Sequence, residues 1–143
     1  MKIALGSDHG GYKLKEIIKK YLQHKQLEFV DFGTDSLQSV DYPDFAFPVA
    51  EAVAKGEFEK GILFCGSGVG VTITANKVPG IRAVNAYDTY TAKQSRQHGD
   101  CNVLCLGGRR LSKAKATKIV ATWLRTDFSG DERHLRRLKK IER

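Results

Sequence analysis

The sequence is poor in cysteine, with three such residues in 143: Cys65, Cys101 and Cys105. An odd number of cysteines cannot pair completely, and a chain of this length buries enough surface to fold without disulfides. The spacing His98-x-x-Cys101-x-x-x-Cys105 does not match a zinc site, and both cysteines fall in an apolar segment. We therefore expect no metal and a reducing compartment.

Long apolar segments are also missing. No apolar run approaches the length of about 20 residues that a transmembrane helix needs. The polar residues Ser7-Asp8-His9 interrupt the first apolar run too early for the core of a signal peptide. We found no internal repeat, low-complexity tract or linker, so we expect one cytoplasmic domain, residues 1–143, without membrane contact.

Acidic residues are outnumbered, with 24 Lys and Arg against 16 Asp and Glu, which gives a net charge of +8. Residues 133–143 contribute five of these charges, because they hold six basic residues and one glutamate. Leu135, Leu138 and Ile141 recur there at helical spacing, which indicates an amphipathic helix with a solvated basic face. No helix-turn-helix, RNA-recognition or zinc-finger pattern accompanies the charge, so we expect no nucleic-acid partner.

Two familiar phosphate-binding motifs fail in the segment around residue 66. Val71 stands where the dinucleotide motif needs its third glycine, and no Lys-Ser/Thr pair follows Gly70, as a P-loop requires. What is present is the apolar run Gly61–Cys65, then alternating glycines, then a helical segment. This order predicts a strand, a tight loop and a helix, with free N–H groups that can bind an anion.

A thiol at this strand end lies beside the positive end of the following helix, which favours the thiolate. Cys65 is therefore a candidate base or nucleophile. The alternative is that Cys65 only fills space in the core, as most free cysteines do.

Apolar and amphipathic segments alternate along the chain. We expect strands over Lys2–Gly6, Glu28–Phe32, Lys60–Cys65, Ile81–Ala86 and Asn102–Gly107. We expect helices over Gly11–Lys25, from Pro43 to near Gly56, over 69–77, Thr89–Gln97, Lys113–Arg125 (capped by Ser112) and at the basic C-terminus. The pattern predicts an α/β fold: a Rossmann-like three-layer sandwich with a five-stranded parallel sheet and an extra C-terminal helix.

The carboxyl edge of this sheet gathers the polar residues that follow its strands. They are Ser7-Asp8-His9, Cys65–Gly70, Tyr87-Asp88 and Gly107-Gly108-Arg109. Ligands bind at such edges, so we place the site there. An Asp-His pair at a strand end, however, is as often a cap as a catalytic pair.

Three residues elsewhere could also act on a ligand. Arg133 and Arg137 share one helix face and could bind a phosphate together, although surface charge is the simpler reading. His98 could be a general acid or base, or it could merely end a helix before Gly99.

Several separated motifs in one order resemble the type B ribose-5-phosphate isomerases, within a group that includes galactose-6-phosphate isomerase subunits and allose-6-phosphate isomerases. The motifs are Gly6-Ser7-Asp8-His9-Gly10-Gly11, Asp41-Tyr42-Pro43, Cys65-Gly66-Ser67-Gly68-Val69-Gly70, Ala75-Asn76-Lys77, Gly80-Ile81-Arg82-Ala83, Ser95-Arg96-Gln97-His98, Asn102-Val103-Leu104, Gly107-Gly108-Arg109 and Arg133-His134 with Arg137.

The resemblance implies an aldose-ketose isomerase of the pentose phosphate pathway that interconverts ribose 5-phosphate and ribulose 5-phosphate without metal or cofactor. It implies that Cys65 removes the C2 proton, that backbone N–H groups of Gly66, Ser67, Gly68, Val69 and Gly70 hold the enediolate, and that Ser67 moves protons between oxygens. His98 would open the sugar ring and Asp8 would position the hydroxyls. The implied phosphate ligands are His9, Arg133 and Arg137, while Tyr42, Gly99 and Arg109 line the site.

The resemblance further implies a homodimer, or a tetramer, whose sites are shared, with His98 and Arg109 supplied by the neighbouring subunit. Val71 occupies the position of a glutamate base found in members that lack the cysteine, which supports Cys65 as the base. Gly99 replaces a frequent asparagine and leaves the sugar preference open.

Two alternatives remain open at this point. A hexose 6-phosphate isomerase, acting on allose or galactose 6-phosphate, needs room for one more carbon. A non-catalytic module that binds a sugar phosphate or nucleotide does not need a thiol.

Overall fold

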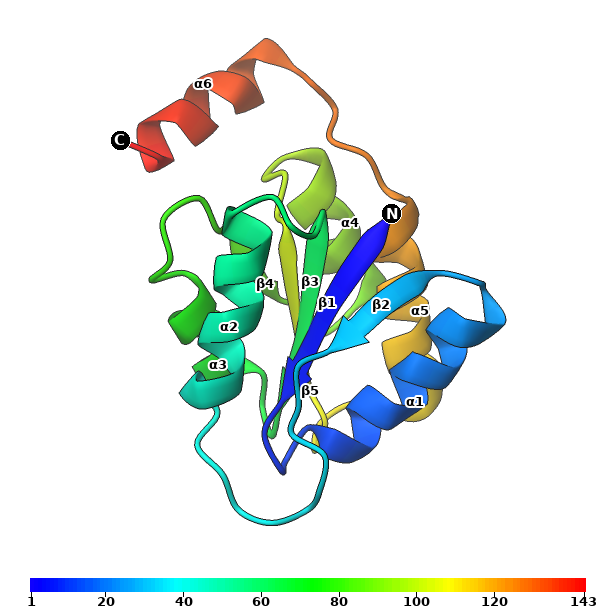
Figure 1. The fold of residues 1–143 in the computed structure, drawn as a ribbon. Helices are drawn as coiled ribbons and strands as arrows, with labels where there is room; N and C mark the ends of the chain where they lie inside the picture. Colours follow the sequence, from blue (N-terminus) through cyan, green and yellow to red (C-terminus); the bar gives the residue numbers. More distant parts are fainter.

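Five parallel strands form the centre of the structure, a computed structural model that describes residues 1–143 (Figure 1). The strands are β1 (Lys2–Ser7), β2 (Glu28–Asp31), β3 (Lys60–Cys65), β4 (Ala83–Asn85) and β5 (Val103–Gly107), in the order β2-β1-β3-β5-β4. The helices are α1 (Tyr12–His24), α2 (Pro43–Ala54), α3 (Val69–Ala75), α4 (Thr89–Gln97), α5 (Lys113–Arg125) and α6 (Glu132–Ile141). The predicted three-layer α/β sandwich with a parallel sheet is confirmed.

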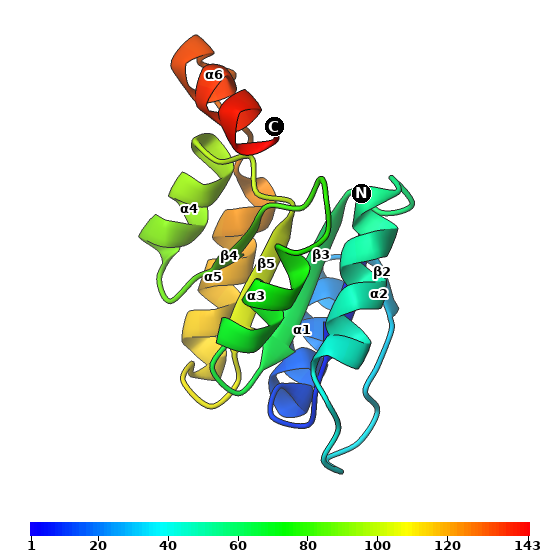
Figure 2. The ribbon, with the colours of Figure 1, turned by 90° about the vertical axis from the view of Figure 1, so that its left-hand side faces the viewer.

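The sheet is buried on both faces, which explains its nearly continuous apolar strands. Side chains alternate along β3: Ile62 and Phe64 belong to one core cluster, whereas Leu63 and Cys65 belong to the other. The first cluster also contains side chains of α1 and α5, and the second contains side chains of α2 and α3. Figure 2 shows these two helix pairs on opposite sides of the sheet.

Strand β4 is shorter than the predicted Ile81–Ala86. The Ile81 N–H bonds to the Val78 carbonyl at 3.1 Å in a turn, and the Arg82 N–H bonds to the Asn102 side chain at 2.9 Å. The N–H groups of Ile81 and Arg82 are therefore not available for pairing with β5, and this pairing begins only at Ala83. The apolar residue Ile81 thus lies outside the strand. The cap predicted at Ser112 is confirmed, since its hydroxyl accepts the Lys115 N–H at 3.2 Å.

Helix α6 stands apart from the sandwich, beyond the end of the sheet at which β3 and β5 begin (Figures 1 and 2). Of its residues only His134 is buried, although its basic amphipathic pattern matches the expected C-terminal helix. The ion pair between Arg82 and Glu142, at 2.7 Å, ties the end of α6 to the sandwich. This helix therefore leaves most of its apolar stripe open.

A buried lysine fixes the loop after β2. Lys15 of α1 is fully buried, and its ammonium donates to Asp31 at 2.7 Å and to the Thr34 carbonyl. Although burial opposes it, hydrogen bonds from Lys15, Lys19 and the Gly33 N–H lower the pKa of Asp31. The ionised carboxylate thus compensates a charge that would otherwise be buried alone.

Asp31→Asn should lower the free energy of unfolding at pH 7 by about 1–3 kcal/mol, because Lys15 loses its charged partner. The lowered pKa means that the carboxylate stabilises the fold above the ordinary carboxyl pKa and stops doing so as the pH falls through its own value. Denaturant titration should therefore show the gap between wild type and variant closing below about pH 4. Asp35→Asn, at an exposed carboxylate, serves as the control, and an equal effect there would contradict this assignment.

Candidate active site at the carboxyl edge of the sheet

A cleft of about 620 Å³ opens where β1, β3 and β5 end. It is lined by Asp8, Tyr42, Cys65, Gly66, Ser67, Val69, Gly70, Ile73, Arg109 and Arg110. The expected site at this edge thus brings Asp8, Tyr42, most of the glycine loop and Arg109 around one cavity.

Cys65 is the last residue of β3 and is 4% exposed at the floor of this cleft. Its sulfur accepts the Gly68 N–H at 3.1 Å. The other two thiols lie in different surroundings: burial raises the pKa of Cys101 to about 11 and that of Cys105 to about 12. Cys65 is the thiol that both faces the cleft and receives a backbone donor, so packing alone does not account for its placement.

The loop that carries this donor is held from the side of β4. Gly68 has φ of 85°, a left-handed conformation that glycine adopts without strain, and a Cβ there would collide with Oδ1 of Asn85. The Asn85 amide and the Tyr87 hydroxyl both donate to the Ser67 carbonyl at 3.4 Å. Asn85 was not among the predicted site residues, although it is a polar residue at a strand end of the same edge.

Arg109 follows β5 and lies over the glycines of the two neighbouring loops. A Cβ on Gly66 would be 3.0 Å from its Nη1, and one on Gly10 would be 3.3 Å from its Cζ. The Arg109 N–H also bonds to the Gly66 carbonyl at 3.0 Å. The expectation that a neighbouring subunit supplies Arg109 is corrected here, because its own backbone anchors it in the cleft of the same chain.

Asp8 and His9 follow β1 at the same edge. Asp8 lines the cleft, and its Oδ1 accepts the Gly11 N–H at 3.0 Å, so it also caps the turn before α1. His9 is not among the lining residues, and its Nδ1 accepts the Val40 N–H at 3.2 Å. This bond leaves Nε2 as the nitrogen that can donate to a ligand.

The remaining wall of the cleft comes from the loops before α2, after β3 and after β5 and from α3. The Tyr42 ring packs against Gly70, where a Cβ would lie 2.6 Å from its carbons. The Ser67 hydroxyl accepts the Val69 N–H at 3.2 Å and is exposed. Arg110 and Ile73 also line the cleft. Neither was predicted as a site residue, although Arg110 adjoins the predicted Gly107-Gly108-Arg109.

A second cluster surrounds His98. This residue is the C-cap of α4, and its ring stacks on that of His134 in α6, with centroids 4.1 Å apart and planes at 16°. Desolvation and the neighbouring His98 lower the pKa of His134, which favours its neutral form. Arg133 and Arg137 flank His134 on α6, and both are exposed. Nothing in the sequence indicated that these two rings would stack.

The two clusters lie at opposite ends of the sheet. The Asn102 carbonyl, a few residues after His98, accepts the N–H of Gly61 at the start of β3, whereas Cys65 ends that strand. Four residues of strand separate Gly61 from Cys65 by about 13 Å. One chain therefore does not bring His98, Gly99, Arg133 or Arg137 to its own cleft.

No group of three or more His, Cys, Asp or Glu side chains is arranged to hold a metal ion. The helices are also too short or too polar for any of them to cross a membrane.

Gly68→Ala should be markedly more destabilising than Gly56→Ala, a matched control. Both glycines have positive φ, 85° and 79°, but a Cβ on Gly56 meets nothing within 4 Å. The control should cost about 1–2 kcal/mol for backbone strain alone. The collision with Asn85 should add about 1–3 kcal/mol to Gly68→Ala. Equal losses in chemical denaturation would show that Asn85 does not brace the loop.

The chain is similar to known sugar phosphate isomerases along nearly its whole length. A family model described as Ribose/Galactose Isomerase matches residues 3–141. The Ribose-5-phosphate isomerase B of Escherichia coli is 47% identical over 98% of this chain and 93% of its own length.

Solved structures extend the match. A Clostridium thermocellum Ribose-5-Phosphate Isomerase B aligns with a TM-score of 0.97 and 51% identity, covering 99% of this chain and 95% of the other. The Mycoplasma genitalium Ribose-5-phosphate Isomerase B with bound Ribulose-5-phosphate aligns with a TM-score of 0.94 and 45% identity, covering 99% of this chain and 93% of the other. With a family match along nearly its whole length, the chain is an isomerase and belongs to the ribose/galactose isomerase family, as its resemblance to the type B ribose-5-phosphate isomerases predicted.

Proposed function

We propose that this isomerase interconverts ribose 5-phosphate and ribulose 5-phosphate through an enediolate, with Cys65 as the base. The hydrogen bond from the Gly68 N–H to the Cys65 sulfur carries the proposal, because it stabilises negative charge on the one thiol that faces the cleft. The relatives named above act on the same sugar phosphate or bind its ketose form.

The proton balance of the reaction fits the residues around the cleft. The thiolate takes the proton from C2 of the open-chain aldose, and the electron pair left behind forms the C1–C2 double bond. Negative charge then develops on the sugar oxygens, which backbone N–H groups of residues 66–70 stabilise. Within this loop the Gly68 and Val69 N–H groups already bond to Cys65 and Ser67, so those of Gly66, Ser67 and Gly70 are the available donors. The exposed Ser67 hydroxyl passes a proton from the C2 oxygen to the C1 oxygen, and the thiol returns its proton to C1.

The second cluster supplies the remaining roles. In this proposal His98 opens the furanose ring, while Arg133 and Arg137 bind the phosphate together with His9. Asp8 and Arg109 orient the sugar hydroxyls. Because the His98 cluster lies at the other end of the sheet, a complete site requires two chains, with His98 and the two arginines of one facing Cys65 of the other.

Exposed apolar residues beside the cleft support a shared site. Val69 and Ile73 of α3 are 47% and 57% exposed at its rim, where a second chain would cover them. We therefore propose a homodimer with two shared sites, which can pair further into a tetramer. The cytoplasmic location expected from the sequence stays a prediction.

Purified protein should isomerise ribose 5-phosphate with a higher kcat/KM than allose 6-phosphate or galactose 6-phosphate. Cys65→Ala should lower kcat by about 10²–10⁴-fold, the contribution of a general base, while the sugar phosphate still binds. Cys101→Ser is the matched control and should retain activity. Preferred turnover of a hexose 6-phosphate would favour the alternative substrate, and normal turnover by Cys65→Ala would remove the thiol from the mechanism.

Mixing two inactive variants should restore activity. A heterodimer of Cys65→Ala and His98→Ala has one site with both lesions and one with neither, so random subunit exchange recovers about a quarter of the wild-type sites. Exchange can be verified with differently tagged subunits. If exchange is complete and no activity returns, each site is built within one chain.

A further inference from the structure

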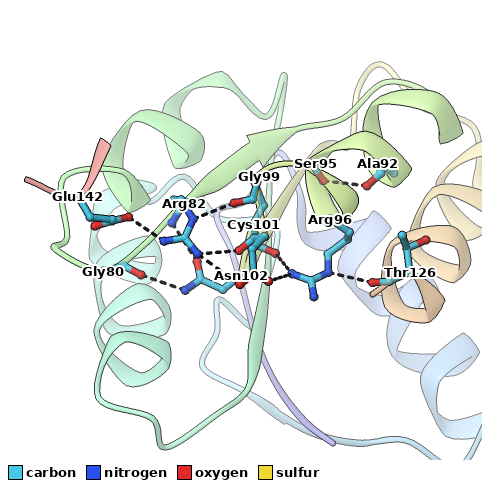
Figure 3. Close-up of polar contacts among 11 residues, drawn as sticks. Gly80, Arg82, Ala92, Ser95, Arg96, Gly99, Cys101, Asn102, Thr126 and Glu142 are labelled. Atoms are coloured by element: carbon cyan, nitrogen blue, oxygen red, sulfur yellow. Dashed lines mark hydrogen bonds and ion pairs between the residues drawn. The ribbon is translucent and has the colours of Figure 1, made fainter. Parts of the chain in front are cut away.

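Arg82 connects the two parts of the His98 cluster: the turn after α4 that carries His98, and helix α6 with His134, Arg133 and Arg137. Its Nε donates to the Gly99 carbonyl at 2.8 Å, and its Nη2 donates to the Asp100 carbonyl at 3.0 Å. Its Nη1 donates to Oε1 of Glu142, the C-cap of α6, at 2.7 Å. Figure 3 shows the guanidinium between the turn after α4 and the end of α6.

The turn that Arg82 contacts follows His98 directly and has a costly conformation. Asp100 has φ of 42°, in the left-handed region that a residue with a side chain rarely occupies. Its carboxylate accepts a hydrogen bond from Nη1 of Arg96 at 2.9 Å, and Arg96 also donates to the carbonyls of Cys101 and Thr126. Two arginines thus hold the backbone that sets the position of the His98 ring.

The contact with Glu142 connects this turn to the phosphate-binding helix of the proposed function. Arg133 and Arg137 lie on α6, which meets the turn at the stacked rings of His98 and His134 and again at the Arg82–Glu142 pair. Two separated contacts fix the direction of a helix, whereas one contact would leave it free to pivot. Of these two contacts, only the stacking of the His98 and His134 rings would hold α6 against the turn if Arg82 were removed.

We infer that Arg82 is a positioning residue that holds His98 and the arginines of α6 in one fixed arrangement. This inference rests on the proposed function, since it takes the roles of His98, Arg133 and Arg137 from there. The planar guanidinium satisfies three acceptors in different directions at once, which the single ammonium of a lysine does less well. Small displacements of catalytic groups are costly, with about 10²-fold in rate for about 1 Å.

The two connections of Arg82 should have separable kinetic effects on isomerisation of ribose 5-phosphate. Glu142→Ala frees the end of α6 but leaves the His98 turn bonded, so KM and the inhibition constant of inorganic phosphate should rise about three- to five-fold with kcat unchanged. Arg82→Lys keeps a charge near Glu142 but loses donors to the turn, so kcat should fall about 10-fold with a smaller effect on phosphate inhibition. Arg82→Gln should lower kcat and also raise KM and the inhibition constant of phosphate.

The control is Arg136→Gln, which removes the same positive charge as Arg82→Gln but from an exposed position of α6. It should leave kcat, KM and the inhibition constant of phosphate within about two-fold of wild type. Melting temperatures identify loss of folded protein, which lowers apparent kcat without altering KM or phosphate inhibition. The inference is overturned if Glu142→Ala and Arg82→Lys leave kcat, KM and the inhibition constant of phosphate within two-fold of wild type. It is also overturned if only the apparent kcat falls, and does so in proportion to the fraction of folded protein. Glu142→Ala keeps the test decisive even if the Arg82 variants do not fold.

Failure of the proposed function has a different signature. If His98→Ala and Cys65→Ala isomerise the sugar phosphate normally, the roles assumed for the cluster are wrong. If both are inactive while Glu142→Ala and Arg82→Lys behave as wild type, only the inference about Arg82 fails.

Discussion

The parallel pairing of β3 with β1 and β5 determines where Asp8, Cys65 and Arg109 of the cleft lie. Phe64 is in register with Ser7 on one side and Leu106 on the other, so the three strands end side by side. Asp8, Cys65 and Arg109 are the residues that follow or complete these ends. A slip of one residue would turn Cys65 to the opposite face of the sheet and separate its sulfur from the Gly68 N–H. The chemistry therefore depends on a hydrogen-bond ladder built from buried apolar strands.

Close approach of backbone to side chain is the second constraint on the cleft. Arg109 reaches across Gly10 and Gly66, Tyr42 packs on Gly70, and Asn85 occupies the space beside Gly68 where a Cβ would stand. The glycine loop is thus enclosed by side chains from three different segments of the chain, which limits its movement. A loop held in this way presents its N–H donors in fixed directions before a ligand arrives, as the proposed electrostatic stabilisation of an enediolate requires.

Much of this arrangement could be predicted from the sequence, because strands with apolar runs and parallel order place the following polar residues at one edge. Asp8, Cys65, Ser67 and Arg109, which were expected at this edge, do line the cleft. The sequence could not predict that Asn85 braces Gly68 or that His98 stacks on His134, since these contacts depend on packing between segments distant in the chain. The early part of the expected fourth strand was wrong for the same reason: the Asn102 side chain, 20 residues away, takes the Arg82 N–H. Arg109 was assigned to the neighbouring subunit by resemblance, and its contacts with Gly10 and Gly66 place it in the cleft of its own chain.

The separation of Cys65 from His98 along the sheet has a consequence for how the enzyme responds to dilution. Under the proposed two-chain site, an isolated subunit holds both halves of the machinery but cannot bring them together. Its activity per subunit then follows the fraction of associated chains and falls by mass action as the protein approaches the dissociation constant of the dimer. Substrate that spans both halves binds only the associated form, so it favours assembly in proportion to its own affinity. Under this proposal, substrate binding and subunit association are linked equilibria.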